Sequence, residues 1–472
     1  MLMKILPFLL VANAVCFSGA AFSQSASIQS KQYQDGGFYE GTFKNGRQHG
    51  QGTYSLPSGY EYSGNWENGT ITGQGIANYA DGSVYEGNFA NGKPSGNGKI
   101  IYSDGGTYSG SWLEGKIDGQ GIASYANGMR YKGGFRATMH HGQGVLTSDD
   151  GYRYEGSWVD GLKQGTGSIT YSDGASYQGS INDGQRSGQG TLTLSDGVVY
   201  QGTWKAGQIS GEGTLTQANS DIFIGNLVDG MRDGLGRVTY ANGDIYEGKF
   251  QNDRRHGHGT FIGADGYHYI GNWSKGQISG QGVATYSDSS VYRGAFLADL
   301  AHGVGTTTYS NGSTYEGDWV AGVINGSGRA TYPNGLVYEG GFKDAQNHGF
   351  GVMTFEDSYH YAGNWKGGKR HGLGQATYRN GTVYKGNFVA GQRAGQGHIK
   401  LKGGFEYLGE WFEGEIHGSG IATYANGDVY EGTFLAGSRQ GGGTMRYASG
   451  AIASGTWVGG TLESKGTPLL SE

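Results

Sequence analysis

Cysteine and proline are nearly absent from this sequence of 472 residues, which contains one cysteine and five prolines. Cys16 lies in an apolar N-terminal stretch, so the remainder of the chain can form neither a disulfide nor a cysteine-based metal site. A collagen helix is excluded because glycine does not recur at every third position. The fold must therefore be held together without covalent cross-links.

Aliphatic residues and basic charge are also scarce. Beside 97 glycines, the chain has 34 tyrosines, 18 phenylalanines and 9 tryptophans. Helices do not tolerate this much glycine, and a disordered chain would have few aromatic residues. We therefore predict an all-β protein. Because the formal net charge is −6, the chain lacks the basic excess that drives sequence-independent nucleic-acid binding, and we expect no nucleic-acid partner.

Long apolar runs are missing outside the N-terminus. Residues 1–4 are short and positive, and residues 5–17 are apolar and are followed by small residues. This pattern predicts a secretory signal peptide over residues 1–23, with an apolar core too short to span a bilayer. We expect an exported protein, in the periplasm, at the cell surface or outside the cell. Acylation of Cys16 is a weaker alternative, because the usual aliphatic residue three positions before the cysteine is missing.

A 23-residue repeat without insertion or deletion fills most of the chain. Position 1 is tyrosine, as at Tyr39 and Tyr62, with Phe223 once in its place. Positions 3, 12 and 14 are glycine, and position 5 is aromatic except at Ile181 and Leu227. This regularity excludes chance and predicts an array of identical structural units.

Each repeat is expected to contain two strands and two turns. Positions 1, 3 and 5 share a face of the first strand, and positions 12, 14 and 16 share a face of the second. We infer that the glycines at positions 12 and 14 lie beside aromatic rings of an adjacent strand; backbone flexibility, the alternative, explains only the turn glycines. The Asn/Asp-Gly pair at positions 20 and 21 predicts a three-residue hairpin turn that sets position 16 opposite the next tyrosine. Positions 6–11 are expected to form a longer loop.

Position 5 alternates between phenylalanine and tryptophan, which suggests a true unit of 46 residues. Tryptophan repeats mostly carry alanine at position 16, and phenylalanine repeats mostly carry a larger residue, with Thr307 as the small exception. We interpret this as a larger ring paired with a smaller partner in one packed layer; recent duplication of a two-repeat unit is the alternative. The alternation slips between Ile181 and Phe250, which predicts a bend, a boundary between two duplicated arrays or a partner site there.

The repeats are predicted to extend over residues 33–460 in about nineteen copies, the last of them incomplete. Residues 24–32 are expected to be a short polar linker. Residues 461–472 are expected to be a C-terminal tail that blunts pairing at the end of the sheet.

The repeat resembles the MORN (membrane occupation and recognition nexus) family, in which Tyr-Glu-Gly is followed by an aromatic residue two positions on and by Gly-x-Gly about nine residues after the first glycine. Residues 85–89 read Tyr-Glu-Gly-Asn-Phe and residues 96–98 read Gly-Asn-Gly. The resemblance implies an elongated, twisted antiparallel sheet of successive hairpins, a solenoid-like rod, and roles in scaffolding, membrane apposition or phosphoinositide binding. Position 2 departs from glutamate in several copies, for example at Lys132, which puts a regular acidic ligand site in doubt.

We predict a non-catalytic, exported scaffold that binds an unknown protein partner or a second copy of itself in the cell envelope. A sheet with one aromatic face must cover that face by curvature, self-association or a partner. Binding to an anionic membrane surface and glycan binding through the aromatic ladder are the alternatives. The candidate interaction surface comprises Tyr85, Phe89, Trp112, Tyr246, Phe250, Trp273, Tyr315 and Trp319.

Basic residues in the position 6–11 loops could face anionic lipid, although acidic residues interleave with them, and a solvated edge of mixed charge is the better interpretation. The candidate basic contacts are Arg254, Arg255, Lys366, Lys369 and Arg370.

We expect no catalytic residue, no cofactor and no metal site. Seven histidines occupy position 11, but copies ~10 Å apart cannot share one metal ion, so hydrogen bonding in the loops is the expected role. The segment from Gly363 to Arg370 approaches a phosphate-binding loop but lacks the required Ser or Thr. The histidines at position 11 are His49, His141, His256, His302, His348, His371 and His417.

Overall fold

The computed structural model describes residues 27–356 and 358–465. The predicted signal peptide, Cys16 and the last residues of the predicted tail lie outside the described residues. Every regular element in the described ranges is a β-strand, which confirms the all-β prediction. The contacts divide the chain into a first unit that ends at Ser195 and a second that begins at Asp196, a division that falls within the interval where the Phe/Trp alternation slips.

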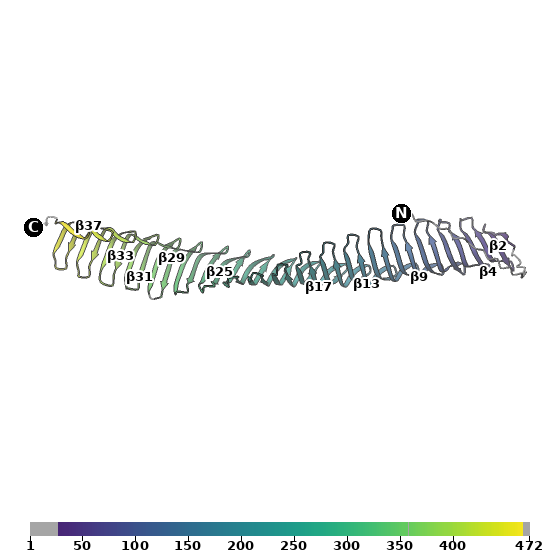
Figure 1. Cartoon of the computed structure of the whole chain (residues 1–472), viewed down its shortest axis with the longest axis horizontal. Helices are drawn as coiled ribbons and strands as arrows, with labels where there is room; N and C mark the ends of the chain where they lie inside the picture. The colour runs from purple at the N-terminus through teal and green to yellow at the C-terminus, as the bar shows by residue number, and fades with distance from the viewer. Residues whose placement is uncertain (1–26, 357, 466–472) are drawn as a thin grey trace, which may run out of the picture. The chain divides into compact units, whose positions relative to one another are not determined.

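In the first unit, consecutive strands pair antiparallel from β1 through β15. Figure 1 shows these strands following one another in sequence order, from purple to blue. The strands are β1 (Gln29–Gln32), β2 (Phe38–Lys44), β3 (Arg47–Ser55), β4 (Glu61–Glu67), β5 (Thr70–Asn78), β6 (Val84–Ala90), β7 (Lys93–Ile101), β8 (Thr107–Leu113), β9 (Lys116–Ser124), β10 (Arg130–Arg136), β11 (Met139–Thr147), β12 (Arg153–Val159), β13 (Leu162–Thr170), β14 (Ser176–Asn182) and β15 (Gln185–Thr193).

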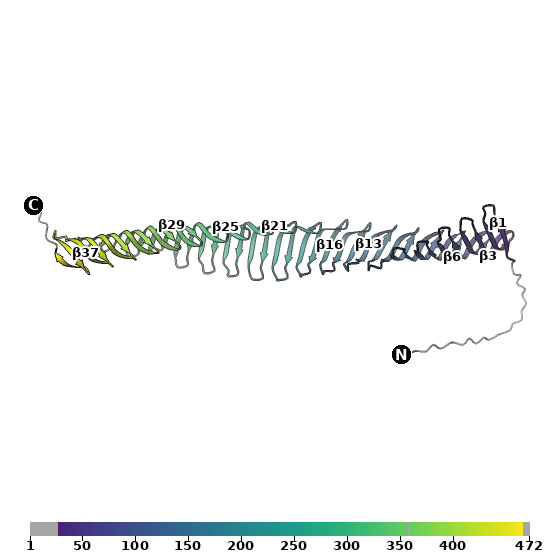
Figure 2. The same cartoon turned by 90° about the horizontal axis from the view of Figure 1, so that it is seen from above.

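The second unit repeats the same antiparallel order, and its connecting loops follow the two sides of the sheet (Figure 2). Its strands are β16 (Val199–Lys205), β17 (Gln208–Thr216), β18 (Ile222–Val228), β19 (Met231–Thr239), β20 (Ile245–Gln251), β21 (Arg254–Ile262), β22 (His268–Ser274), β23 (Gln277–Thr285), β24 (Val291–Leu297), β25 (Leu300–Thr308), β26 (Thr314–Val320), β27 (Val323–Thr331), β28 (Leu336–Lys343), β29 (Gln346–Phe355), β30 (Tyr359–Lys366), β31 (Lys369–Tyr378), β32 (Val383–Val389), β33 (Gln392–Lys400), β34 (Glu406–Phe412), β35 (Glu415–Thr423), β36 (Val429–Leu435), β37 (Ser438–Arg446), β38 (Ile452–Val458) and β39 (Thr461–Lys465).

Both ends of the strand array extend beyond the predicted repeats. Residues 29–32, predicted as part of a linker, form β1 and pair with β2. Residues 461–465, predicted as the start of a tail, form β39 and pair with β38. Both boundary predictions were wrong because antiparallel pairing uses backbone N–H and C=O groups. A polar segment outside the repeats supplies these groups as well as a repeat does.

The predicted three-residue turn is confirmed. In the turn that joins β5 to β6, the N–H of Tyr79 donates to the carbonyl of Ser83 at 2.8 Å, and the N–H of Gly82 donates to the carbonyl of Tyr79 at 3.0 Å. Gly82 has φ of +88°, a left-handed conformation that favours glycine. The Asp81 carboxylate accepts the N–H of Ser83 at 2.9 Å, which explains Asp or Asn at position 20.

The expected long loop at positions 6–11 is instead a two-residue turn. β2 ends at Lys44 and β3 begins at Arg47, so positions 9–11 lie on a strand. Asn45 and Gly46 both have positive φ, 52° and 74°, as in a type I′ hairpin turn. A loop was predicted because glycine-rich sequence does not distinguish a tight turn from a long one.

The two strand glycines have different structural roles. A Cβ at Gly98, position 14, would lie 2.2 Å from the hydroxyl oxygen of Tyr85, so the prediction that this glycine lies beside an aromatic ring is confirmed. For position 12 the prediction was wrong. Gly96 has φ of +91° and faces the side chain of Asn88, because the ladder contains a bulge between Gly87 and Phe89.

Thr138 occupies the tight-turn position that is glycine in most repeats, and it has φ of +75°. A β-branched residue is strained in the left-handed region, at a cost of about 1 kcal/mol. We therefore expect Thr138→Gly to stabilise the β10–β11 hairpin by about 1 kcal/mol, measured as slower amide hydrogen exchange in these strands. The reciprocal control is Gly161→Thr, at φ of +86° with no atom near its added Cβ. Faster exchange in Thr138→Gly would contradict the strain argument.

Candidate functional site

The eight aromatic side chains predicted to form an interaction surface form a buried layer instead. The most exposed of them, Trp319, is only 9% exposed. The Tyr85 ring meets Phe89 and Trp112 edge-on, with a centroid distance of 5.0 Å to each. The prediction was wrong because the rings cover one another, which leaves no ring face for a partner. The buried residues are Tyr85, Phe89, Trp112, Tyr246, Phe250, Trp273, Tyr315 and Trp319.

Each buried tyrosine of this layer is fixed by its own repeat. The Tyr62 hydroxyl donates to the carbonyl of Asn65 at 3.1 Å, and burial raises the pKa of Tyr62 to about 12. The phenol therefore stays protonated and keeps donating to the strand bulge. These tyrosines are structural groups, and their environment does not prepare them for proton transfer.

The position 5 ring lies against the preceding repeat, which reverses the predicted pairing of ring sizes. The Trp66 indole N–H donates to the carbonyl of Gly52 at 3.1 Å, and its ring lies 6.1 Å from that of Tyr54, the large position 16 residue of the preceding repeat. Conversely, Ala123 lines a groove together with Phe135 of the following repeat. Large rings therefore mostly meet large residues, and small rings small ones, so the interpretation of a larger ring paired with a smaller partner in one packed layer was wrong.

Two of the five predicted basic contacts belong to the aromatic layer. The Arg255 guanidinium lies 4.2 Å from the centroid of the Trp273 ring, and the Arg370 guanidinium lies 4.9 Å from that of Phe388. Both side chains are only partly exposed, whereas Arg254, Lys366 and Lys369 are exposed. Arg255 and Arg370 were misplaced because position 10 belongs to a strand, where its side chain faces the rings.

Two of the position 11 histidines accept backbone hydrogen bonds from the neighbouring tight turn. Nδ1 of His141 accepts the N–H of Asp160 at 3.5 Å, and Nδ1 of His302 accepts the N–H of Ala321 at 3.4 Å. For these two histidines the expected hydrogen-bonding role is confirmed, although both lie on strands and not in loops. No group of three or more His, Cys, Asp or Glu side chains suited to a metal ion occurs in the described residues.

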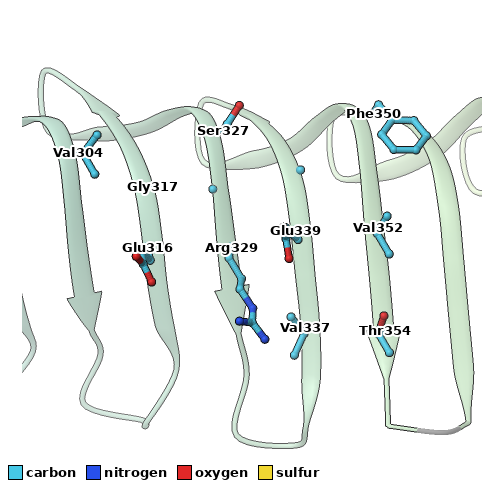
Figure 3. A pocket seen from close by; sticks show the side chains of 12 residues that line it. Val304, Glu316, Gly317, Ser327, Arg329, Val337, Glu339, Phe350, Val352 and Thr354 are labelled. Atoms are coloured by element: carbon cyan, nitrogen blue, oxygen red, sulfur yellow. The ribbon is translucent and has the colours of Figure 1, made fainter.

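The opposite face of the second unit carries a shallow depression of about 1040 Å³. Arg329 is cross-strand partner to Glu316 on one side and to Glu339 on the other. Figure 3 shows these three side chains on adjacent strands, with Val304 and Phe350 toward the two ends of the depression. A row of alternating charge between two apolar side chains could bind a surface of matching pattern.

A second depression, of about 540 Å³, adjoins the first and shares Phe350 with it. Its apolar lining includes Leu373 and Leu408. Phe350 and Leu373 both occupy position 13 of their repeats, and each is 64% exposed. Two exposed, large apolar side chains on neighbouring repeats form a patch of the kind that marks interaction sites.

The residues at position 13 indicate this patch in the sequence. The aromatic residues form a more regular pattern, and they were predicted to be the interaction surface instead. In the first unit position 13 is polar in every complete repeat, whereas the second unit places apolar residues there in several copies. The polar residues of the first unit are Gln51, Gln74, Asn97, Gln120, Gln143, Thr166 and Gln189.

Residues 27–356 and 358–465 include no helix that is long and apolar enough to cross a bilayer.

Comparison with solved structures gives only distant similarity. The SAS-4 (dCPAP) TCP domain of Drosophila melanogaster, solved with a proline-rich motif of Ana2, is 12% identical with a TM-score of 0.21, covering 45% of this chain and 97% of that one. The TCP10 domain of Danio rerio CPAP is 13% identical with a TM-score of 0.21, covering 53% and 99%. A virginiamycin B lyase from Staphylococcus aureus is 11% identical with a TM-score of 0.11, covering 63% and 97%. Similarity at this level carries no argument about function.

No curated protein matches the chain. The MORN repeat model, in contrast, matches eighteen consecutive segments between residues 39 and 452. The matched segments coincide with the hairpins described above, beginning at Tyr39, Tyr62 and Tyr85 in the first three copies. This chain belongs to the MORN repeat family.

Proposed function

We propose that this MORN repeat protein is an exported, non-catalytic scaffold. It binds a protein partner through the face of its second unit that lies opposite the aromatic layer. The observation that carries the proposal is the exposed apolar pair Phe350 and Leu373. Burial of exposed, large apolar side chains in an interface costs little free energy and contributes about 25 cal/mol of binding free energy per Å² of apolar surface buried.

Two further features support a protein partner. The apolar pair adjoins the charged row of Glu316, Arg329 and Glu339, and an apolar centre with a charged margin is typical of protein interfaces. An anionic membrane surface is less favoured, because Arg255 and Arg370 are engaged with aromatic rings. Export is proposed from the pattern of residues 1–23 alone.

The test replaces both apolar residues by the polar residue that the first unit carries at this position. We expect Phe350→Gln with Leu373→Gln to reduce recovery of the crosslinked partner from the native envelope at least about tenfold, as for the loss of a central interface residue. The control variant is Gln51→Ala with Gln74→Ala, at the same repeat position in the first unit. Undiminished crosslinking in the double variant would refute this binding surface.

A second copy of the chain is distinguished from another protein by sedimentation velocity. If the partner is a second copy, the purified wild-type chain sediments as a dimer and the double variant as a monomer. If it is another protein, both sediment as monomers and only the crosslinked product differs.

A further inference from the structure

Tyrosines at position 18, beside the three-residue turns, line grooves on the aromatic side of the sheet. One groove in the first unit, of about 480 Å³, lies between Tyr102 and Tyr125. One in the second unit, of about 420 Å³, lies between Tyr309 and Tyr332. These four rings are partly exposed, so this tyrosine row, unlike the buried layer below it, is available to a ligand.

The two grooves have equivalent floors because of the Phe/Trp alternation. Ala123 and Phe135 line the first, and Ala330 and Phe342 line the second. A small position 16 residue next to the smaller aromatic ring leaves space that a larger residue would fill. Because the alternation repeats every second repeat, a groove of this kind recurs at every second repeat in which a small position 16 residue lies next to a phenylalanine ring.

Thr307 creates an additional cavity on this side of the second unit. Position 16 carries a large residue in the other complete phenylalanine repeats of this unit, and here a cavity of about 530 Å³ is lined by Thr307, Trp319 and Tyr309. This cavity and the Tyr309–Tyr332 groove share Tyr309, Asp288 and Ser290. The result is a continuous site along the row formed by Tyr286, Tyr309 and Tyr332.

Two residues that line this cavity each have a buried polar side-chain atom without a hydrogen-bond partner among the described residues: the hydroxyl oxygen of Thr307 and the indole nitrogen of Trp319. Thr307 is 4% exposed and Trp319 is 9% exposed. Elsewhere the indole donates to a glycine carbonyl of the preceding repeat at 3.1–3.4 Å, as in Trp66, Trp112, Trp158, Trp273, Trp365, Trp411 and Trp457. A buried donor without a partner destabilises the folded protein, so these two groups together favour a ligand that both donates and accepts.

Asp288 adds charge to the rim of the site. Its carboxylate accepts the N–H and the hydroxyl of Ser290 at 2.8 and 2.9 Å, and these bonds hold the pKa of Asp288 below its ordinary value. The carboxylate stays ionised near neutral pH and disfavours anionic ligands. The site therefore suits a neutral ligand with hydroxyl groups.

We infer that residues 286–345 form a binding site for an extended, neutral β-1,4-linked glycan, held by the tyrosine row and by the unpaired groups of Thr307 and Trp319. The tyrosines recur every second strand, ~10 Å apart, which is comparable to the length of one disaccharide of such a glycan. Apolar faces of sugar rings stack on aromatic rings, and sugar hydroxyls both donate and accept. A polyproline II peptide repeats every ~9 Å and is therefore the competing ligand.

The test uses the full chain with hexasaccharides of β-1,4-linked glucose and β-1,4-linked N-acetylglucosamine, followed by isothermal calorimetry and by NMR of the indole N–H signals. We expect at least one of them to bind and to shift the Trp319 signal, while the Trp273 signal, whose N–H is bonded to Gly259, stays in place. The α-1,4-linked glucose hexasaccharide, which is curved, should not bind.

Three variants locate the site. Thr307→Met fills the cavity with a residue found at this position in other repeats and should weaken binding at least about tenfold, whereas Thr307→Val removes only the hydroxyl and should weaken it about fivefold. Met445→Leu, at the equivalent position of another repeat, is the control and should leave the affinity unchanged.

The inference is overturned if neither β-1,4-linked hexasaccharide releases heat, or if Thr307→Met binds like the wild type. A proline-rich dodecapeptide that binds and shifts the Trp319 signal, where the glycans do not, would also overturn it in favour of an extended peptide. Neither glycan binding nor peptide binding depends on whether the Phe350 variant loses its protein partner, because Phe350 lies on the opposite face.

Discussion

Substitution of Gly98 by alanine is expected to unfold the repeat around it. The added Cβ would lie 2.2 Å from the Tyr85 hydroxyl oxygen and 2.5 Å from two carbons of its ring, closer than any real contact. Tyr85 is fully buried and meets Phe89 and Trp112 edge-on, so the ring cannot move aside without leaving the layer. We expect a loss of about 3–5 kcal/mol, the range for displacing a large core side chain.

The measurement is amide hydrogen exchange across β6, β7 and β8, because an array of repeats opens locally and a single melting temperature would hide the effect. The matched control is Gly442→Ala. Gly442 also lies in a strand, β37, but a Cβ there meets no atom within 4 Å, and its exchange should be unchanged or slightly slower. Equal exchange in the two variants would mean that the tyrosine layer is looser than its geometry indicates.

Local features of this fold were predictable from the sequence because the sequence specifies them locally. Turn residues set the hairpin that holds Gly82 at positive φ, and a strict period sets the antiparallel order. Glycine at position 14 was predictable for the same reason, since only glycine permits a ring to lie across a neighbouring strand.

Relations between repeats were predicted less well. Trp66 and Ala77 belong to the same repeat, and their sequence pairing suggested contact; the Trp66 ring instead lies against Tyr54 of the preceding repeat. The direction in which a side chain leans along the sheet is set by packing and not by residue type. Arg255 was assigned to a loop for a similar reason, since the tight turn places position 10 on a strand above the rings.

The candidate sites followed from exceptions to the repeat. Buried aromatic residues recur in each copy because they hold the fold, and recurrence made them the most conspicuous candidates. Phe350 and Thr307, in contrast, depart from the residue that their position carries elsewhere. In a protein of near-identical units, residues that break a local pattern without structural need are the better indicators of function.

His140 is such an exception, and it makes the stability of the first unit depend on pH. Its ring stacks on Tyr131 at a centroid distance of 3.7 Å, and its Nε2 lies 2.6 Å from the Tyr125 hydroxyl oxygen. Burial lowers the pKa of His140 from 6.5 to about 4. The other repeats accommodate an uncharged residue or a long basic side chain at this position, as with Ile117 and Lys163.

The direction of the effect follows from which state binds the proton first. In the unfolded chain the imidazole is protonated below about pH 6.5, whereas in the folded chain it stays neutral until about pH 4. The contribution of His140 to stability is therefore complete above about pH 6.5 and is lost as the pH falls toward 4. The full shift would correspond to about 3 kcal/mol, which solvent screening of this partly exposed ring reduces to about 1–2 kcal/mol.

We expect amide hydrogens of β10, β11 and β12 to exchange faster at pH 4.5 than at pH 7, after correction for the intrinsic pH dependence of exchange. The comparison is His140→Ile, which puts at this position the residue of the Ile117 repeat and should remove the acid sensitivity of these strands while leaving that of β20 and β21 unchanged. If the variant and the wild type lose protection equally on acidification, the imidazole is already protonated in the folded state. The Tyr125 hydroxyl would then have to accept a hydrogen bond from it.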